Sequence, residues 1–172
     1  RQALNADAGS IYLVEGTQLV IHYAQNATLQ KRLKPGEKLP FSIFSFPISD
    51  ETIAGAAVKT KQFINEPNVY DISPDKQYKF GTISDTITGY KTVSALTMPL
   101  VAVSGDVLGV LQMINALDVH GRIRAFTSDD EMFLSHFAAN AAATLMHASL
   151  TREMILRMVQ MAELHDPRET GL

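Results

Sequence analysis

The side chains that could carry out chemistry are few in this sequence and lie far apart. There is no cysteine, and the histidines before residue 150 form no i, i+4 or other short-spaced pair typical of metal ligands; they are His22, His120, His136 and His147. Local structure explains two other candidate motifs, because Ser104-Gly105-Asp106 is typical of a turn and Asp129-Asp130-Glu131 of a helix start. We therefore expect neither a metal site nor a catalytic nucleophile.

The composition predicts one globular domain. The chain has 172 residues, of which 46% are hydrophobic and 19% charged, enough for a single well-buried core. A net charge of −3 provides no basic surface for nucleic acid, and no apolar run reaches the roughly 20 residues that a membrane helix needs. The absence of cysteine fits a reducing cytoplasm, where we expect the protein to act. The abrupt ends of the sequence suggest a segment of a longer protein.

The stretch from Ser94 to Asn115 is predicted to form the central hairpin of a sheet. Two runs rich in Val, Leu, Ile and Met flank the turn residues Ser104-Gly105-Asp106, and neither run has a charged face. Both faces of the sheet should therefore be covered. Pro99 lacks an N–H, which predicts a strand edge, a bulge or a nearby cavity at its position. A second hairpin is predicted around Gly16-Thr17.

Other segments are predicted to surround this sheet. Residues 1–6 should be the end of a helix. Ser49-Asp50-Glu51-Thr52 is typical of a helix start, and the small residues 53–58 that follow can approach a sheet closely or leave room for a ligand. The stretch from Glu66 to Lys91 is predicted to be a long connection of the kind that forms lids.

A long helix is predicted from Ser128, where Ser128 and Glu131 have the spacing of a capping box. No Gly or Pro follows before Pro167, so roughly 38 residues could form one rod about 57 Å long. An apolar stripe in its first half should pack on the sheet: Phe133, Phe137, Ala141, Leu145 and Ala148. A second stripe has no local cover: Leu150, Met154, Met158 and Met161. We therefore predict a parallel homodimer joined by the helix beyond Leu145.

Several motifs together resemble the GAF domain of cyclic-nucleotide phosphodiesterases. They are Asp85 to Thr92, Met98-Pro99-Leu100, Gly109 to Asn115, and Phe126 separated by three residues from Asp130-Glu131. The resemblance implies an α+β GAF fold, with a central antiparallel sheet, helices on both faces, a long C-terminal helix and a small-molecule pocket. In the family's signature a Lys follows the Asn and pairs with the Asp. Ala116 stands at that position, so we expect Asp130 to be free for helix capping.

The same resemblance implies a set of ligand-binding residues. For relatives that bind cyclic nucleotides, the set carried onto this chain is Ser10, the backbone of Ile53 and Ala54, Asp85, Thr88, Thr92 and Gln112. Each has an ordinary alternative: the threonines can cap a loop, Asp85 can begin a turn, and Gln112 can pair with backbone.

Two departures from the cyclic-GMP binders disfavour that nucleotide. Ala24 and Gln25 stand where those relatives place an aromatic residue and an Asp. Asp50 and Glu51 lie at a helix N-terminus where a phosphate would be expected, and their charge opposes an anion. No cofactor is certain, and the ligand, a cyclic nucleotide or another small molecule, stays open.

The last residues resemble the opening of an HD-GYP domain, a cyclic di-GMP phosphodiesterase. The resemblance covers residues 162–171 and implies that Glu169 would be one metal ligand, without the others needed for hydrolysis. The implied organisation is a GAF sensory domain at 1–150, a linker helix at 151–165 and the start of an HD-GYP domain at 166–172. Two functions remain open: a ligand-binding sensor that controls the phosphodiesterase, or a ligandless dimerisation and signal-relay module.

Overall fold

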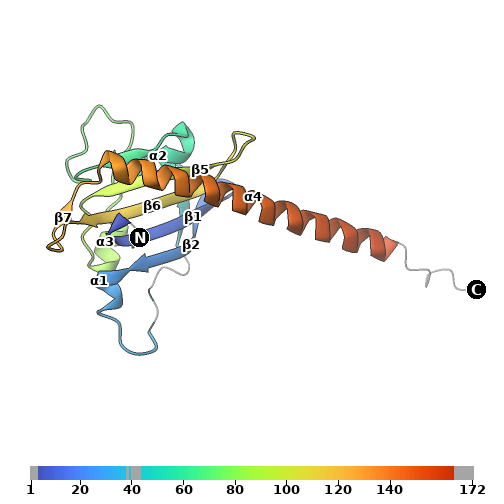
Figure 1. The fold of residues 1–172 in the computed structure, drawn as a ribbon, viewed down its shortest axis with the longest axis horizontal. Coiled ribbons are helices and arrows are strands. Elements are labelled where there is room, and N and C mark those ends of the chain that lie inside the picture. Colours follow the sequence, from blue (N-terminus) through green and yellow to red (C-terminus); the bar gives the residue numbers. More distant parts are fainter. Residues whose placement is uncertain (1–3, 38, 40–43, 165–172) are drawn as a thin grey trace, which may run out of the picture.

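The computed structural model describes residues 4–37, 39 and 44–164, and they form one antiparallel sheet with helices on both faces (Figure 1). The strand order is β3-β2-β1-β6-β5-β4, and β7 pairs with the end of β6. The strands are β1 (Ala6–Glu15), β2 (Gln18–Asn26), β3 (Ser45–Pro47), β4 (Ile64–Glu66), β5 (Ala95–Val101), β6 (Val107–Leu117) and β7 (Ile123–Arg124). The helices are α1 (Ala27–Gln30), α2 (Ile53–Thr60), α3 (Ile83–Thr88) and α4 (Ser128–Leu164). The predicted fold class is confirmed.

Both predicted hairpins are confirmed. β1 and β2 are joined at Gly16, and β5 and β6 at Gly105, which has a φ of 87° that favours glycine. Pro99 lies on β5 beyond the end of β4, because β4 pairs with β5 only as far as Thr97. Its missing N–H therefore interrupts no ladder, as expected for a strand edge. Pro99 does not line the cavity described below.

The two faces of the central hairpin contact different helices. α4 packs Leu134, Ala138 and Ala142 against one face, which includes Leu96 and Met113. α2 packs on the opposite face, where the sheet contributes Ala95 and Val110. Consecutive strand residues point to opposite faces, so two apolar layers on one hairpin explain why its sequence has no polar side.

Some local predictions were incomplete. The connection from Glu66 to Lys91 contains a short helix, α3, and the polar stretch after β6 contains β7. Strand β1 already begins at Ala6, so the helix expected over residues 1–6 is wrong at that residue, and residues 1–3 lie outside the described part. Short elements of this size have too few residues for a hydrophobic period to be visible.

The first stripe predicted on α4 is wrong by one position. Phe133 and Phe137 are 47% and 49% exposed, and Ala148 is also exposed, whereas Leu134 and Ala138 are buried. One residue is 100° of helix rotation. The small side chains of the alanines let α4 approach the sheet more closely than the phenylalanines would. Ala141 and Leu145 are partly buried against the core, as predicted.

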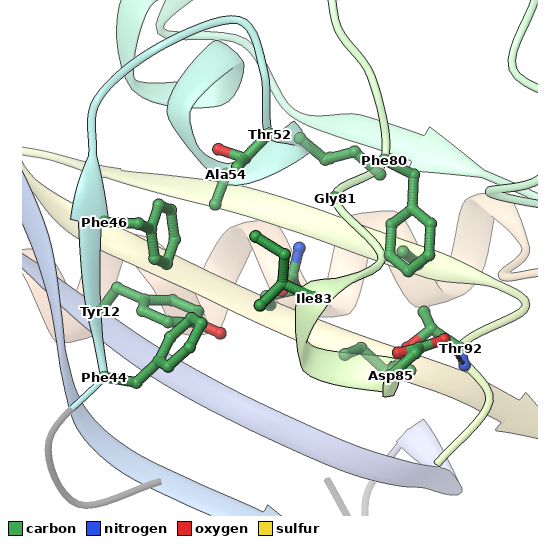
Figure 2. Close-up of a pocket in the computed structure, with 14 residues that line it drawn as sticks. Tyr12, Phe44, Phe46, Thr52, Ala54, Phe80, Gly81, Ile83, Asp85 and Thr92 are labelled. Carbon is green, nitrogen blue, oxygen red and sulfur yellow. Dashed lines mark hydrogen bonds between the residues drawn. The ribbon is translucent and has the colours of Figure 1, made fainter. Parts of the chain in front are cut away.

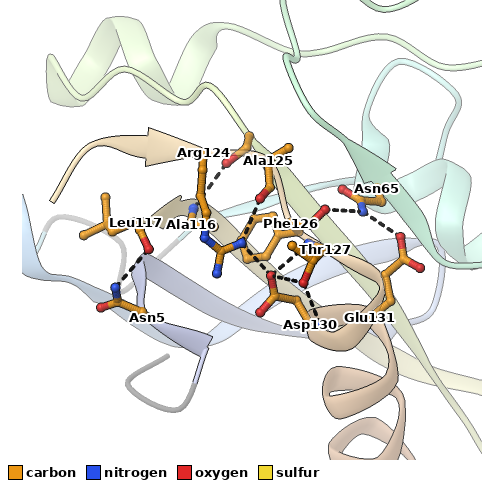
Figure 3. A network of polar contacts seen from close by, with 11 residues as sticks. Asn5, Asn65, Ala116, Leu117, Arg124, Ala125, Phe126, Thr127, Asp130 and Glu131 are labelled. Carbon is orange, nitrogen blue, oxygen red and sulfur yellow. Dashed lines mark hydrogen bonds and ion pairs between the residues drawn. The ribbon is translucent and has the colours of Figure 1, made fainter. Parts of the chain in front are cut away.

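The N-terminus of α4 is capped differently from the prediction (Figure 3). The Asp130 carboxylate accepts from the backbone N–H of Thr127 at 2.8 Å, and Thr127 Oγ1 accepts from the backbone N–H of Asp130 at 3.3 Å. The capping box therefore joins Thr127 and Asp130, one residue before the expected pair. Glu131 instead accepts a hydrogen bond from Asn65 at 2.6 Å, which ties α4 to β4.

Asp130 is also not free of an ion pair. Arg124 Nη1 lies 2.7 Å from its carboxylate, and strand pairing places Arg124 directly beside Ala116 (Figure 3). The neighbouring strand thus supplies the cation that Ala116 cannot. Burial alone would raise the pKa of Asp130, but hydrogen bonds from Arg124 and Thr127 outweigh it and hold the pKa below its ordinary value of 3.8.

Within the described ranges, no helix combines the length and the apolar character needed to cross a bilayer.

Candidate ligand-binding site

A cavity of about 150 Å³ lies between α2, α3, the segment around β3 and one face of the sheet (Figure 2). It is on the face opposite α4, because its floor residues Ala95 and Gln112 alternate with residues that contact α4. The described residues that line it are Tyr12, Phe44, Phe46, Thr52, Ile53, Ala54, Phe80, Gly81, Ile83, Asp85, Thr92, Ala95, Gln112 and Ile114.

The N-terminal end of α2 is held against the cavity by close backbone packing. A β-carbon at Gly55 would lie 2.2 Å from the carbonyl oxygen of Ser49, so only glycine fits there. Thr52 caps the helix, its Oγ1 accepting from the Gly55 N–H at 3.0 Å. These contacts place Ile53 and Ala54 at the cavity wall.

Helix α3 is fastened beside the cavity by Asp85. Its carboxylate accepts from Thr92 N–H and Thr92 Oγ1, both at 2.7 Å, and from the Tyr70 hydroxyl at 2.9 Å. Burial raises the pKa of Tyr70, and the bond to Asp85 raises it further. Asp85 therefore ties α3 to the two loops that carry Tyr70 and Thr92, and these bonds hold the helix over the cavity as a lid.

The sheet contributes two polar groups to the cavity. The Gln112 amide donates from Nε2 to Thr97 Oγ1 at 2.9 Å. Tyr12 lies two residues from Ser10 on the same face of β1, and burial raises the pKa of its phenol, an effect that a hydrogen bond with Ser10 partly offsets. These hydrogen bonds hold the Tyr12 phenol and the Gln112 amide in place in the apolar floor.

A buried polar network supports the loop between α3 and β5. The Tyr90 hydroxyl donates to Asp7 at 2.8 Å and accepts from Asn115 Nδ2 at 2.9 Å. Asn115 Oδ1 accepts from the backbone N–H of Val93 at 2.7 Å. Burial, followed by the bond to Asp7, raises the pKa of Tyr90. Asn115 of the predicted motif thus holds the chain that carries Thr92 to the cavity.

Five of the seven sequence-predicted site residues line the cavity, namely Ile53, Ala54, Asp85, Thr92 and Gln112. Ser10 is not among the lining residues, but it forms a hydrogen bond with Tyr12, which is. Thr88 does not line the cavity, and its Oγ1 accepts from the Tyr90 N–H at 3.2 Å, which is the loop-capping alternative. The role of these residues as ligand contacts stays a prediction.

The aromatic lining was missed. Tyr12, Phe44, Phe46 and Phe80 border the cavity, and only Tyr12 follows a predicted site residue at the two-residue spacing of a strand face. The alternation in Phe44-Ser45-Phe46 was a second usable signal. Ala24 and Gln25, expected at the base-binding position of cyclic-GMP binders, are not among the lining residues.

Groups of three or more His, Asp or Glu side chains placed to hold a metal ion do not occur in the described part of the chain. Glu169, the expected ligand of a downstream metal site, lies outside that part.

The fold is that of a GAF domain, and the chain belongs to the GAF domain family, whose model matches residues 1–145. As such it is a regulatory, small-molecule-binding signalling domain of a kind found in phosphodiesterases. It is 34% identical over 117 residues to a cGMP-specific 3',5'-cyclic phosphodiesterase of Drosophila melanogaster, covering 64% of this chain and 10% of that protein. It is 29% identical over 155 residues to the dual 3',5'-cyclic-AMP and -GMP phosphodiesterase 11 of the same species, covering 86% of this chain and 10% of that one. The chain thus spans about a tenth of the length of these curated relatives.

Solved structures support the fold. The GAF domain of a phosphoenolpyruvate-protein phosphotransferase from Coxiella burnetii aligns with a TM-score of 0.63 at 20% identity, covering 88% of this chain and 79% of that one. Residues 122 to 287 of a methyl-accepting chemotaxis protein align with a TM-score of 0.64 at 16% identity, covering 87% and 84%.

Proposed function

We propose that this chain is the sensor of a longer signalling protein, in which a small molecule bound beneath α3 controls a downstream HD-GYP phosphodiesterase acting on cyclic di-GMP. The observation that carries the ligand part is the cavity itself, which combines an apolar lining with a few convergent polar groups, as binding sites do. The proposal places the domain boundaries at 1–150, 151–165 and 166–172. It also places the protein in the cytoplasm, away from membrane and nucleic acid.

The route from cavity to downstream domain runs through the central hairpin. Gln112 faces the cavity, while its neighbours Leu111 and Met113 belong to the core that contacts α4. A ligand that shifts β6 therefore bears directly on the helix that leads towards residues 162–171, whose sequence resembles an HD-GYP opening. In Figure 1, α4 extends far beyond the edge of the sheet.

We further propose that α4 forms a parallel homodimer. Four apolar side chains of α4 are more than half exposed: Leu150 (54%), Met154 (59%), Met158 (56%) and Met161 (61%). Apolar side chains buried in an interface would be far less exposed. At 100° per residue, Phe133 and Phe137 lie in the same sector of the helix as Met154 and Met158. The exposed apolar face therefore begins earlier than Leu145, and the interface we propose extends along most of α4.

Ligand binding is expected to stabilise the fold measurably. A ligand present at 100 times its dissociation constant should raise the free energy of unfolding by about 2.7 kcal/mol, seen as a higher thermal midpoint. Cyclic AMP and cyclic GMP, suggested by the names of the curated relatives, and cyclic di-GMP form the first panel. A matched protein with Ala54→Leu, which fills the cavity, should show no shift.

The ligand-free alternative has its own outcome in that experiment. If native mass spectrometry of protein purified from cells finds no bound small molecule, and neither the panel nor a metabolite extract changes the midpoint, ligand sensing is refuted. The exposed face of α4 would then favour a module that dimerises and relays signals without a ligand.

This chain alone should not hydrolyse cyclic di-GMP, with or without added Mn²⁺ or Fe²⁺. A hydrolytic metal cluster needs several ligands, and the HD-GYP resemblance assigns only Glu169. Chromatography of the nucleotide after incubation measures this directly. Turnover above a buffer blank that disappears in Glu169→Ala would contradict the prediction.

A further inference from the structure

The cavity beneath α3 is small for a nucleotide site. Sites for drug-sized ligands usually enclose about 300–1,000 Å³, whereas this one measures about 150 Å³. An apolar cavity of about 150 Å³ in another protein stays dry and binds benzene. The available space therefore fits one ring or two fused rings without movement of the surrounding elements.

The walls favour a flat, apolar ligand. At one end Phe46 contacts Tyr12 with ring centroids 5.4 Å apart and Phe44 at 5.9 Å, and Phe80 stands at the other end (Figure 2). Aromatic rings in offset or edge contact with a planar ligand contribute binding free energy beyond that of the apolar area they bury. Ile83 lines the cavity yet is 65% exposed, so it marks the side open to solvent.

The charges around the cavity disfavour an anion. None of the described lining residues is Lys, Arg or His, and Asp85 supplies a carboxylate. The donors that contact Asp85 are neutral hydroxyl and amide groups of Thr92 and Tyr70. A phosphate or carboxylate entering this site would lose its hydration, and the described lining residues offer no cation to compensate.

One hydrogen-bond acceptor is positioned for the ligand. Gln112 uses its Nε2 to donate to Thr97, and no donor among the described residues contacts its Oε1. The Gln112 side chain is only partly buried. A ligand that covered its oxygen without bringing an N–H or O–H would leave a buried acceptor unpaired, which is costly.

We propose that the ligand is an uncharged planar aromatic compound of one or two fused rings that carries an N–H or O–H donor. The donor bonds to Gln112, the ring lies among Tyr12, Phe46 and Phe80, and no anionic group is accepted. This inference rests on the proposed ligand-sensing function and specifies the class of molecule that the site takes.

Isothermal titration with indole and two close analogues tests the proposal. Indole should bind with a dissociation constant below about 1 mM. Benzofuran, which has the same shape without the N–H, and indole-3-carboxylate, which adds an anion, should each bind at least about ten-fold more weakly. Ala54→Leu should abolish indole binding, while Ala139→Leu, the same change at an exposed position of α4, should leave it unchanged.

The failures of the two proposals are distinguishable. Binding of cyclic AMP, cyclic GMP or indole-3-carboxylate as tight as that of indole, lost in Ala54→Leu, overturns the ligand class but leaves ligand sensing supported. Indole binding that persists in a folded Ala54→Leu protein, or no binding of indole at millimolar concentration, also overturns it. Folding of each variant is checked by its amide NMR spectrum.

Discussion

Replacing Met154 and Met158 together with Glu is expected to convert a dimer of this chain into monomers that keep the GAF fold. Both side chains are more than half exposed and lie on one face of α4, four residues apart. Burial of a Met or Leu side chain contributes about 1.5–3 kcal/mol. Four such residues on each of two helices would offset the usual cost of association, and four introduced carboxylates in one seam would reverse the balance.

The control places the same charges on the other side of the helix. Leu156→Glu with Gln160→Glu has the same four-residue spacing, but at 100° per residue these positions lie about 160° from Met158. Sedimentation at tens of micromolar should find the wild type and this control dimeric and the methionine double variant monomeric. A monomeric wild type, or a double variant that stays dimeric, would exclude this face as the main interface.

The strand pattern was predictable because it is set by local rules. The turn residues at Gly16 and Gly105 and the absence of charge on the central hairpin identified both hairpins and the two covered faces. The orientation of α4 was not predictable in the same way, because apolar residues occur on adjacent sectors of its surface. Which sector faces the sheet depends on how closely the backbone can approach, and that depends on the side chains of β5 and β6.

The polar part of the site was accessible from family motifs, whereas the sequence offered only two local signals for the aromatic part, the spacing of Tyr12 from Ser10 and the alternation in Phe44-Ser45-Phe46. Asp85, Thr92 and Gln112 occur in motifs with fixed spacing, and the structure brings them to one cavity. Phe44 and Phe80 lie in connections far apart in the sequence, and no period indicates that they converge. Their position depends on tertiary packing, which a single sequence does not reveal.

Asp130 illustrates the same limit at the level of one charge. Replacement of the expected Lys by Ala116 predicted a carboxylate without an ionic partner, but pairing of β7 with β6 puts Arg124 beside Ala116. A two-residue strand was the missing information. The cation comes from β7 instead of β6, and the ion pair with Asp130 still forms.

Removal of this cation is expected to be costly. The Asp130 side chain is 11% exposed and the Arg124 side chain 33%. Arg124→Ala therefore leaves a nearly buried carboxylate whose remaining hydrogen bonds, among the described residues, come from Thr127. Breaking a fully buried pair costs about 3–5 kcal/mol, and partial exposure of Arg124 reduces the expected loss to about 2–3 kcal/mol. Urea denaturation measures it. Arg122→Ala, which breaks the exposed pair with Asp118 nearby, should cost clearly less, because solvent screens that pair.

A lysine at the family's usual position should restore part of the loss. Ala116→Lys in the Arg124→Ala background should recover at least about 1 kcal/mol, whereas Ala116→Lys alone should destabilise, because Ala116 is fully buried and Arg124 already occupies the carboxylate. If Arg124→Ala lowers the free energy of unfolding no more than Arg122→Ala, or if Ala116→Lys restores none of the loss, Arg124 does not replace the family's lysine.

The ion pair between Arg124 and Asp130 also predicts how the stability difference between the wild type and Arg124→Ala depends on pH. A carboxyl group whose pKa is lower in the folded than in the unfolded chain contributes stability above the unfolded pKa and loses it as the pH falls through the folded pKa. The pKa of Asp130 is held below 3.8. The gap in unfolding free energy between the wild type and Arg124→Ala should therefore be full at pH 7 and close below pH 3.8, where protonation removes the charge that Arg124 compensates. A gap that persists unchanged once Asp130 is protonated would mean that Arg124 stabilises the fold through packing of its stem, not through its charge.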